Sequence, residues 1–347
     1  MLRRLVFLFG VLAIVFVAVT AFVINGFIKQ SEAPFRGYST GEVFVEIETG
    51  DSTQVIAEKL VDSGVVGGYW PLRLAVWRSG QERKLQAGEY RFSEAVSPTE
   101  VVRILAQGRV FLRRITFPEG LNIEEMAEVF ESKLFGARES FISASRRVEL
   151  IKDLDSDAEN LEGYLFPETY SLPRNGTAMD LVEAMVAQFR AAFVGQLKGD
   201  SVVGERSVRD IVTLASLVQK ETGNSSEHSL VSAVYTNRLR IGMRLQCDPT
   251  VIYALQLDGS YDGNLTRASL RFDSPYNTYV YGGLPPGPIA SPGLEALRSV
   301  FEPADVSFLY FVSRNDGSHA FSDTLREHNR NVRKYQIEYF RRQRNSR

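Results

Sequence analysis

The chain has 347 residues, of which 44% are hydrophobic and 24% are charged, and its formal net charge is −2. This composition is typical of a globular protein and argues against extensive disorder, and the length is enough for about two domains. The near-neutral charge also argues against a nucleic-acid-binding protein, because such proteins carry a basic face that neutralises phosphates. We interpret the arginine-rich end, residues 341–347, as a polar tail.

An almost uninterrupted apolar run covers residues 5–28. Its length is close to the ~20 residues that cross the hydrocarbon core of a bilayer as a helix. Arg3 and Arg4 precede the run, and positive charge on a short flank favours the cytoplasmic side. We therefore expect residues 1–28 to form a cytoplasmic stub and a transmembrane anchor, with the rest of the chain across the membrane.

A cleaved signal peptide is the alternative, because Val19, Thr20 and Ala21 include small residues of the kind that a signal peptidase accepts. Apolar residues continue beyond this point as far as Phe27, whereas the core of a signal peptide is usually only about 7 to 15 residues long. The sequence therefore favours the anchor.

The chain has one cysteine, Cys247, and three histidines. A single cysteine can form neither an internal disulfide nor a cysteine-rich metal site. His228, His319 and His328 show no metal-binding spacing such as HExxH, so we interpret each as structural or superficial. The sequence predicts no metal and no cofactor.

Residues 29–41 are polar, contain proline and glycine, and are interpreted as a linker. An α+β unit is predicted after them, over residues 42–110. We expect strands at residues 43–47 and 89–92, a helix after Ser52, a helix from Pro71 to Arg78, and a helix after Ser97. This order, together with the residues at 85–90, resembles a LysM-like module, a type that binds the N-acetyl sugars of peptidoglycan. A small α+β spacer without a ligand is the alternative.

A second mixed α+β domain is predicted over residues 111–340. A strand is expected at 111–117, and Ile123, Met126 and Phe130 mark an amphipathic helix. Residues 161–170 combine aromatic residues with glycine and proline, which suits either packing against a core or a surface on which sugars stack. With the first unit, this gives an α+β fold class for the whole chain.

The most informative segment places Glu221 at the end of an apolar helix. Apolar residues repeat at helical spacing from Ile211 to Val218, and Gly223 and Asn224 interrupt the pattern. A carboxyl group at this point can lie in the wall of a cleft, where neighbouring groups tune its ionisation. Glu221 is therefore the candidate catalytic residue.

Polar residues downstream are candidates for binding. Asp248 with Pro249 has the cap-and-proline signature of a helix start, so Asp248 either hydrogen bonds within the site or caps its helix. Arg244 and Gln246 could bind carboxylates or acetamido groups of a substrate, although an ion pair between Arg244 and Asp248 is the plainer alternative.

A glycine- and proline-rich loop is predicted over residues 274–289. In it, Tyr276 and Tyr279 could stack on sugar rings, and Asn277 and Thr278 could hydrogen bond to hydroxyl and acetamido groups. A rigid structural loop is the alternative for each of these residues.

Several of these segments resemble the YceG-like, or MltG, family of endolytic murein transglycosylases. The resemblance is sharpest at Leu161–Tyr170, Ala215–Thr222, Asn237–Leu239, Gly242–Gln246, Asp248–Thr250, Tyr276–Tyr279 and Gly283–Pro292. Many members have Glu-Lys-Glu where this chain has Gln219, Lys220 and Glu221. Since glutamine cannot donate a proton as a carboxylic acid does, the family's catalytic glutamate corresponds to Glu221. Glu221 and Thr222 also match the Glu-Ser or Glu-Thr pair of other lytic transglycosylases.

The resemblance implies cleavage of the MurNAc-GlcNAc β-1,4 bond of nascent peptidoglycan strands, with formation of 1,6-anhydro-MurNAc ends that terminate strand elongation. One glutamate can serve as acid on the glycosidic oxygen and then as base on the C6 hydroxyl of the same sugar. A neutral acid at working pH requires a raised pKa, so we expect burial to raise the pKa of Glu221 and Lys220 to point away from it.

The resemblance further implies a single-pass protein of the bacterial inner membrane with a periplasmic catalytic domain. Peptidoglycan synthases and elongation or division proteins are its expected partners. Two other functions remain open from the residues alone. One is a membrane-tethered peptidoglycan-binding scaffold without activity. The other is a hydrolytic muramidase in which Asp248 or another acid is the second carboxylate.

Overall fold

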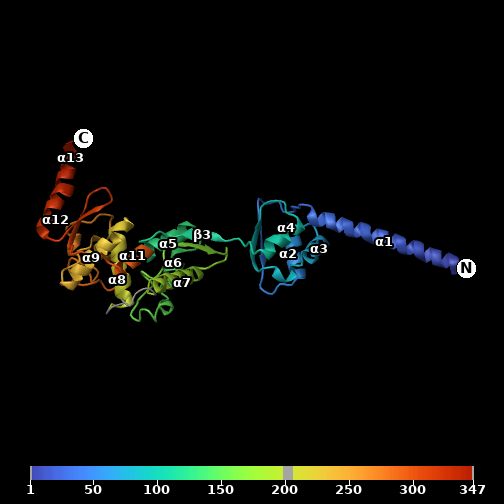
Figure 1. The fold of residues 1–347 in the computed structure, drawn as a ribbon, viewed down its shortest axis with the longest axis horizontal. Helices are drawn as coiled ribbons and strands as arrows, with labels where there is room; N and C mark the ends of the chain where they lie inside the picture. The colour runs from blue at the N-terminus through green and yellow to red at the C-terminus, as the bar shows by residue number, and fades with distance from the viewer. Residues whose placement is uncertain (1, 198–205, 346–347) are drawn as a thin grey trace. The chain divides into compact units, whose positions relative to one another are not determined.

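The computed structural model describes residues 2–197 and 206–345. It divides into two compact units, Met1–Arg113 with Ser171–Asn175, and Arg114–Tyr170 with Gly176–Arg347. Both units mix helices with short antiparallel strand pairs, so the fold is mixed α+β and carries a long apolar helix at its N-terminus (Figure 1). Residues 1, 198–205 and 346–347, which fall in the predicted anchor, catalytic domain and tail, lie outside the described residues.

The N-terminal unit is built around one strand pair and three helices. Its elements are α1 (Leu2–Glu32), β1 (Val43–Ile47), α2 (Thr53–Asp62), α3 (Tyr69–Ser79), η1 (Glu82–Lys84), β2 (Gly88–Phe92) and α4 (Pro98–Ala106). Strands β1 and β2 pair antiparallel, with Val45 opposite Tyr90. Buried side chains of both strands and of α2, α3 and α4 form one core, and Figure 1 shows these three helices lying together.

Local signals account for this unit well. The Ser52 and Ser97 hydroxyls cap α2 and α4 by accepting hydrogen bonds from the third residue of each helix, as expected. Phe9–Glu32 of α1 is 24 residues long and is the one stretch of the described residues that is apolar enough to cross a membrane.

The second unit is mainly helical. Its elements as far as residue 197 are β3 (Arg113–Thr116), α5 (Ile123–Ser132), α6 (Arg138–Ala144), η2 (Val148–Leu150), β4 (Thr169–Leu172) and α7 (Ala178–Leu197). The first residue of β3 and the last two residues of β4 belong to the N-terminal unit. Beyond residue 205 lie α8 (Val208–Glu221), η3 (Ser225–Glu227), α9 (His228–Arg240), α10 (Asp248–Asp258), η4 (Ser269–Arg271) and α11 (Leu294–Phe301). The chain ends with β5 (Tyr310–Ser313), β6 (His319–Ser322), α12 (Leu325–Val332), the π-helical turn η5 (Arg333–Glu338) and α13 (Tyr339–Asn345).

Helix α8 is the centre of this unit. A capping box between Ser207 and Asp210 fixes its start, and eight of its side chains, from Ile211 to Val218, are buried. It packs against α9, α10 and α11, so its last turn is held from several sides. The strand predicted at 111–117 is shorter than expected, because the ladder with β4 covers only residues 113–116.

Candidate active site

Glu221 is the last residue of α8, and its carboxylate is held by two neighbours. The Tyr235 hydroxyl of α9 donates a hydrogen bond of 2.9 Å to Oε2 of Glu221. The Cys247 thiol approaches the same oxygen at 3.5 Å. Because Glu221 is already the end of its helix, its backbone turns away at Thr222 while its side chain stays between α9 and the start of α10.

Burial raises the pKa of Glu221, and the negative charge of Asp248 adds to this effect. The hydrogen bonds from Tyr235 and Cys247 act in the opposite direction but do not outweigh burial. The Lys220 side chain points away from the Glu221 carboxylate, because its ammonium group donates to the Gly120 carbonyl at 3.0 Å. The expectations of a raised pKa and of an outward lysine are both confirmed.

Glu221 lines a cavity of about 290 Å³. Mostly polar and aromatic side chains from α9, α10, α12, β5, β6 and two loops form the rest of the wall. They are Arg238, Gln246, Asp248, Tyr279, Phe311, Val312, Ser313, His319 and His328. Three of the residues singled out in the sequence, Gln246, Asp248 and Tyr279, thus meet at Glu221.

Gln246 and Asp248 are positioned by unusual local structure. Gln246 has a left-handed backbone with φ of 50°, and its N–H donates to the Thr278 carbonyl at 3.2 Å. Asp248 does not cap α10, because its own backbone is already helical and Cys247 is the residue before the helix. Its carboxylate instead accepts a 2.6 Å hydrogen bond from the Tyr279 hydroxyl.

Three other candidate binding residues, Asn277, Thr278 and Thr222, have buried side chains. Asn277 and Thr278 are 0% and 1% exposed. The Asn277 amide donates to the Leu270 and Phe272 carbonyls, and the Thr278 hydroxyl accepts from the N–H of Cys247. Thr222 is also buried, and its hydroxyl accepts from the N–H of Asn224. Because these polar groups are satisfied internally, they shape the loops around Glu221 and do not line its cavity.

Arg244 and Tyr276 lie outside the cavity as well. The exposed Arg244 donates to the Tyr279 carbonyl at 3.1 Å, and no ion pair joins it to Asp248 among the described residues. Tyr276 packs against Tyr253 with ring centroids 5.0 Å apart and lines a separate cavity of about 390 Å³.

Two residues that the sequence did not single out as functional belong to the site. His319 of β6 lines the cavity, and its Nδ1 lies 2.7 Å from Oε2 of Glu227, which is 8% exposed. The same glutamate accepts from the His319 backbone N–H at 2.9 Å. Because the Glu227 carboxylate hydrogen bonds to both the ring and the backbone N–H of His319, it fixes the orientation of the histidine ring. No local spacing signals this pair, because only the fold brings β6 to η3.

The site offers no evident metal centre. Within residues 2–197 and 206–345, no group of three or more histidine, cysteine, aspartate or glutamate side chains is arranged to hold a metal ion. Burial also raises the pKa of Cys247, so its thiol stays protonated and is a poor nucleophile. What the arrangement can provide is proton transfer by Glu221 to a ligand bound among polar and aromatic side chains.

Comparison with known proteins finds similarity to one family by sequence and by structure. Residues 45–334 match the YceG-like family model. The chain is 30% identical over 324 residues to an endolytic murein transglycosylase of Bacillus subtilis (strain 168), covering 88% of each chain. It is 29% identical to an endolytic murein transglycosylase of Streptococcus pneumoniae serotype 2 (strain D39 / NCTC 7466), covering 88% of this chain and 60% of that relative. The crystal structure of a yceG-like protein from Listeria monocytogenes aligns with a TM-score of 0.55 and 29% identity, over 84% of this chain and 99% of the other.

Proposed function

The chain belongs to the YceG-like family, and on that premise we propose that it is an endolytic peptidoglycan lytic transglycosylase with Glu221 as its general acid and base. It cuts the MurNAc-GlcNAc β-1,4 bond of nascent glycan strands, leaves 1,6-anhydro-MurNAc ends and so terminates elongation. The observation that carries the proposal is the placement of Glu221, whose pKa is raised by burial, in a cavity with polar and aromatic walls.

In the first step, protonated Glu221 donates its proton to the glycosidic oxygen as the bond from that oxygen to C1 of MurNAc breaks. Glu221 is then a carboxylate and accepts the proton of the C6 hydroxyl as the C6 oxygen bonds to C1 of the same sugar. The nucleophile belongs to the substrate, so no second protein carboxylate is required and no water enters the reaction. Ring closure within one sugar also avoids the entropic cost of recruiting another molecule.

The neighbours of Glu221 take distinct roles in this proposal. Gln246, Asp248 and Tyr279 contact the glycan from the cavity wall, and the Tyr279 hydroxyl bond keeps Asp248 in place. Asn277 and Thr278 position this wall from behind. Thr222 ends α8, and Arg244 and Tyr276 contact substrate only beyond the cavity.

A muramidase is the second candidate, because Asp248 gives the cavity a second carboxylate beside Glu221. In a hydrolytic reaction such a group would activate water or attack the sugar. The short bond from Tyr279 favours a positioning role for Asp248 instead, since it occupies one of the carboxylate oxygens.

The remainder of the chain is assigned a supporting role. We place the anchor at residues 1–28, with the N-terminus in the cytoplasm, a linker at 29–41, a LysM-like module at 42–110 that holds glycan, and the periplasmic catalytic domain at 111–340. One helix within residues 2–197 and 206–345 is long and apolar enough to cross a membrane, and this helix and the strand-helix-helix-strand order support the arrangement. Synthases and elongation or division proteins are the proposed partners, because an enzyme that terminates strands must meet glycan as it is made.

Product mass tests the proposal. Purified peptidoglycan is digested with the full-length protein in detergent, and the products are weighed by mass spectrometry. A lytic transglycosylase gives internal cuts whose ends are one water lighter than hydrolytic ends. Hydrated ends would establish a muramidase, and the absence of products would leave a binding scaffold.

A further inference from the structure

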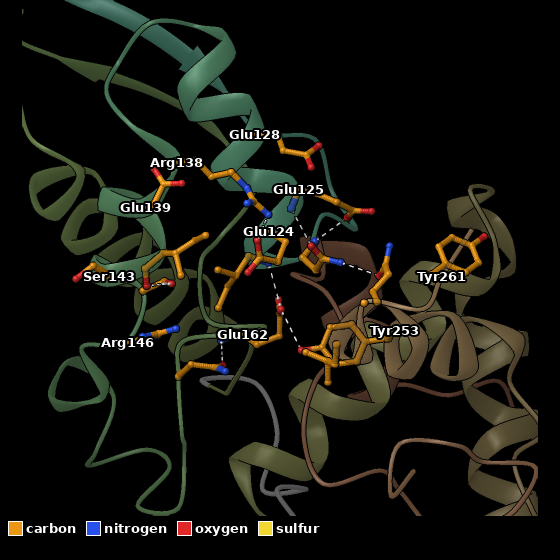
Figure 2. A pocket seen from close by; sticks show the side chains of 18 residues that line it. Glu124, Glu125, Glu128, Arg138, Glu139, Ser143, Arg146, Glu162, Tyr253 and Tyr261 are labelled. Atoms are coloured by element: carbon orange, nitrogen blue, oxygen red, sulfur yellow. Dashed lines mark hydrogen bonds and ion pairs between the residues drawn. The ribbon is translucent and has the colours of Figure 1, made fainter. Parts of the chain in front are cut away.

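The second unit contains a larger cavity, of about 930 Å³, that Glu221 does not line. Its walls come from α5, α6, the loop before β4 and α10 (Figure 2). Helix α10 connects the two cavities, because Asp248 in its first turn belongs to the Glu221 cavity and Tyr253 belongs to the larger one. At the helical rise of 1.5 Å per residue, these two positions are about 8 Å apart along the axis.

The lining of this cavity is strongly acidic. It includes five glutamates, Glu124, Glu125, Glu128, Glu139 and Glu162. The lining has only two basic residues, Arg138 and Arg146, and Arg138 forms an ion pair with Glu124. An excess of carboxylates around a concave site raises the local concentration of cations, so the cavity favours a positively charged ligand.

Glu162 is the one buried residue among these five glutamates. It is 6% exposed and lies between the start of α5 and the Tyr253 ring, as Figure 2 shows. Its Oε2 accepts from the Ile123 N–H and from the Tyr253 hydroxyl, each at 3.2 Å. Its Oε1 has no hydrogen-bond partner. A buried carboxyl oxygen without a partner is costly, and a ligand donor would remove that cost.

The backbone keeps Glu162 at this position. Its own N–H donates to the Asn160 side chain at 2.9 Å. Gly163 follows with φ of +83°, and a Cβ there would lie 2.5 Å from Cβ of Pro288. The turn therefore requires glycine and leaves the Glu162 side chain little freedom to find another partner.

A donor without a partner lies in the same wall. Nε of Arg138 is buried and makes no hydrogen bond, although the terminal guanidinium nitrogen contacts Glu124. The cavity thus presents an unused acceptor at Glu162 and an unused donor at Arg138. A ligand with an ammonium group and a nearby carboxylate or carbonyl would complement both.

We propose that this cavity binds a primary ammonium group through Glu162. Resting on the proposed function, the ligand is the free side-chain amine of the diamino acid in an uncrosslinked peptidoglycan stem peptide. Crosslinking converts that amine into a neutral amide, which loses the charge and two of its donors. The site therefore selects glycan whose stem peptides are not yet crosslinked and holds it next to the cavity of Glu221.

Proton release gives this site a distinctive signature. Burial raises the pKa of Glu162 to about 8, and the negative charge of Glu125 of α5 adds to this effect, whereas the hydrogen bond from the Tyr253 hydroxyl of α10 opposes it. Tyr276 is a further titratable group that interacts with Glu162. Glu162 is therefore largely protonated at pH 7 and must ionise to pair with an ammonium group. Binding at pH 7 is expected to release about 0.9 proton per ligand from this carboxyl.

Calorimetric titration of the full-length protein in detergent tests the proposal. The probe is a stem pentapeptide with a free lysine or diaminopimelate amine, titrated at pH 7 in phosphate and in Tris, whose ionisation enthalpies differ. We expect binding with release of about 0.9 proton, and at least about tenfold weaker binding of the same peptide after acetylation of the amine. Equal affinity for the acetylated peptide, or heats that do not depend on the buffer, would overturn the proposal.

Two matched variants and one further ligand complete the test. Glu162→Gln should weaken binding about tenfold and abolish proton release. Glu128→Gln changes an exposed carboxylate of the same cavity, so it should weaken binding only about two- to fivefold and leave proton release unchanged. Proton release that persists in Glu162→Gln contradicts the assignment. Spermidine should bind more weakly than the peptide, and tighter binding of spermidine would rule out the stem peptide.

These titrations do not require cleavage. If the free amine binds but no anhydro products form, the proposed function fails and the ammonium site stands. If anhydro products form but the amine does not bind, the site fails alone.

Discussion

The hydroxyl of Tyr235 donates a 2.9 Å hydrogen bond to Oε2 of Glu221, from the second turn of α9 to the last residue of α8. A donor stabilises the carboxylate more than the acid, so this bond opposes the burial that raises the pKa of Glu221. Tyr235 therefore limits how far that pKa rises, which suits a residue that must both give and take a proton.

Removal of this donor is expected to move the pH profile. Catalysis begins with protonated Glu221, so activity falls as pH rises through the pKa of Glu221. In Tyr235→Phe that pKa is higher, and the alkaline fall in kcat should move to higher pH by about one unit. Tyr253→Phe is the matched control, because it removes a hydroxyl that donates to Glu162 and leaves the hydrogen bonds of Glu221 intact. It should leave the alkaline fall in kcat at the wild-type pH. A shift to lower pH in Tyr235→Phe would contradict the account.

The stability of the protein should depend on Glu162 in a pH-dependent way. Its folded-state pKa is about 8 against an ordinary 4.5, so the folded state binds the proton more tightly than the unfolded state does. The free energy of unfolding therefore falls as pH rises from 4.5 to 8. The free energy of unfolding of Glu162→Gln minus that of the wild type should therefore rise by about 5 kcal/mol as pH rises across this window. Denaturation at several pH values measures this difference. A constant difference between the two proteins would refute the raised pKa.

Substitution of Asp248 separates the two catalytic proposals. Asparagine can still accept the hydrogen bond from the Tyr279 hydroxyl. Asp248→Asn should therefore keep anhydro-product formation within about tenfold of the wild type, because the carboxylate does not transfer a proton in the transglycosylase reaction. Loss of activity by a factor of about 100 or more, measured as the initial rate of glycan cleavage, would favour the hydrolytic mechanism.

Asn277 should matter for stability. Its buried side chain donates to two carbonyls and accepts from the N–H of Tyr279 at 2.9 Å. Asn277→Ala leaves these groups unsatisfied and should lower the free energy of unfolding by about 2 to 4 kcal/mol. Gln246→Ala, at an exposed residue, should change stability little while lowering cleavage. Equal stability of the two variants would show that Asn277 does not support the loop.

Much of the secondary structure follows from local signals. The serine caps, the proline at the start of α4 and the apolar repeat of α8 act within one or two turns of chain, so they predicted helices at these places. The position of Glu221 at the end of α8 was predicted for the same reason, as was the strand at 43–47. For Asp248 the sequence left two roles open, and the structure shows the hydrogen bond within the site and not the cap, because Cys247 is the residue before the helix.

The composition of the site was harder to predict, because it depends on contacts between distant segments. A polar loop residue can face solvent or the interior, and the sequence around Asn277 and Thr278 does not distinguish these cases. His319 reaches the cavity only through the pairing of β5 with β6 and its contact with Glu227. Glu162 lies in a motif that resembles packing, and its burial against α5 and α10 appears only in three dimensions.

The most direct test of the central claim is the initial rate of glycan cleavage by Glu221→Gln. Glutamine has nearly the same shape and can still accept a hydrogen bond from Tyr235, so thermal unfolding should show an intact fold. It cannot donate a proton to the glycosidic oxygen, and the rate of formation of anhydro products should fall by about 100- to 10,000-fold. A folded Glu221→Gln protein that produces anhydro ends at the wild-type rate would contradict the account.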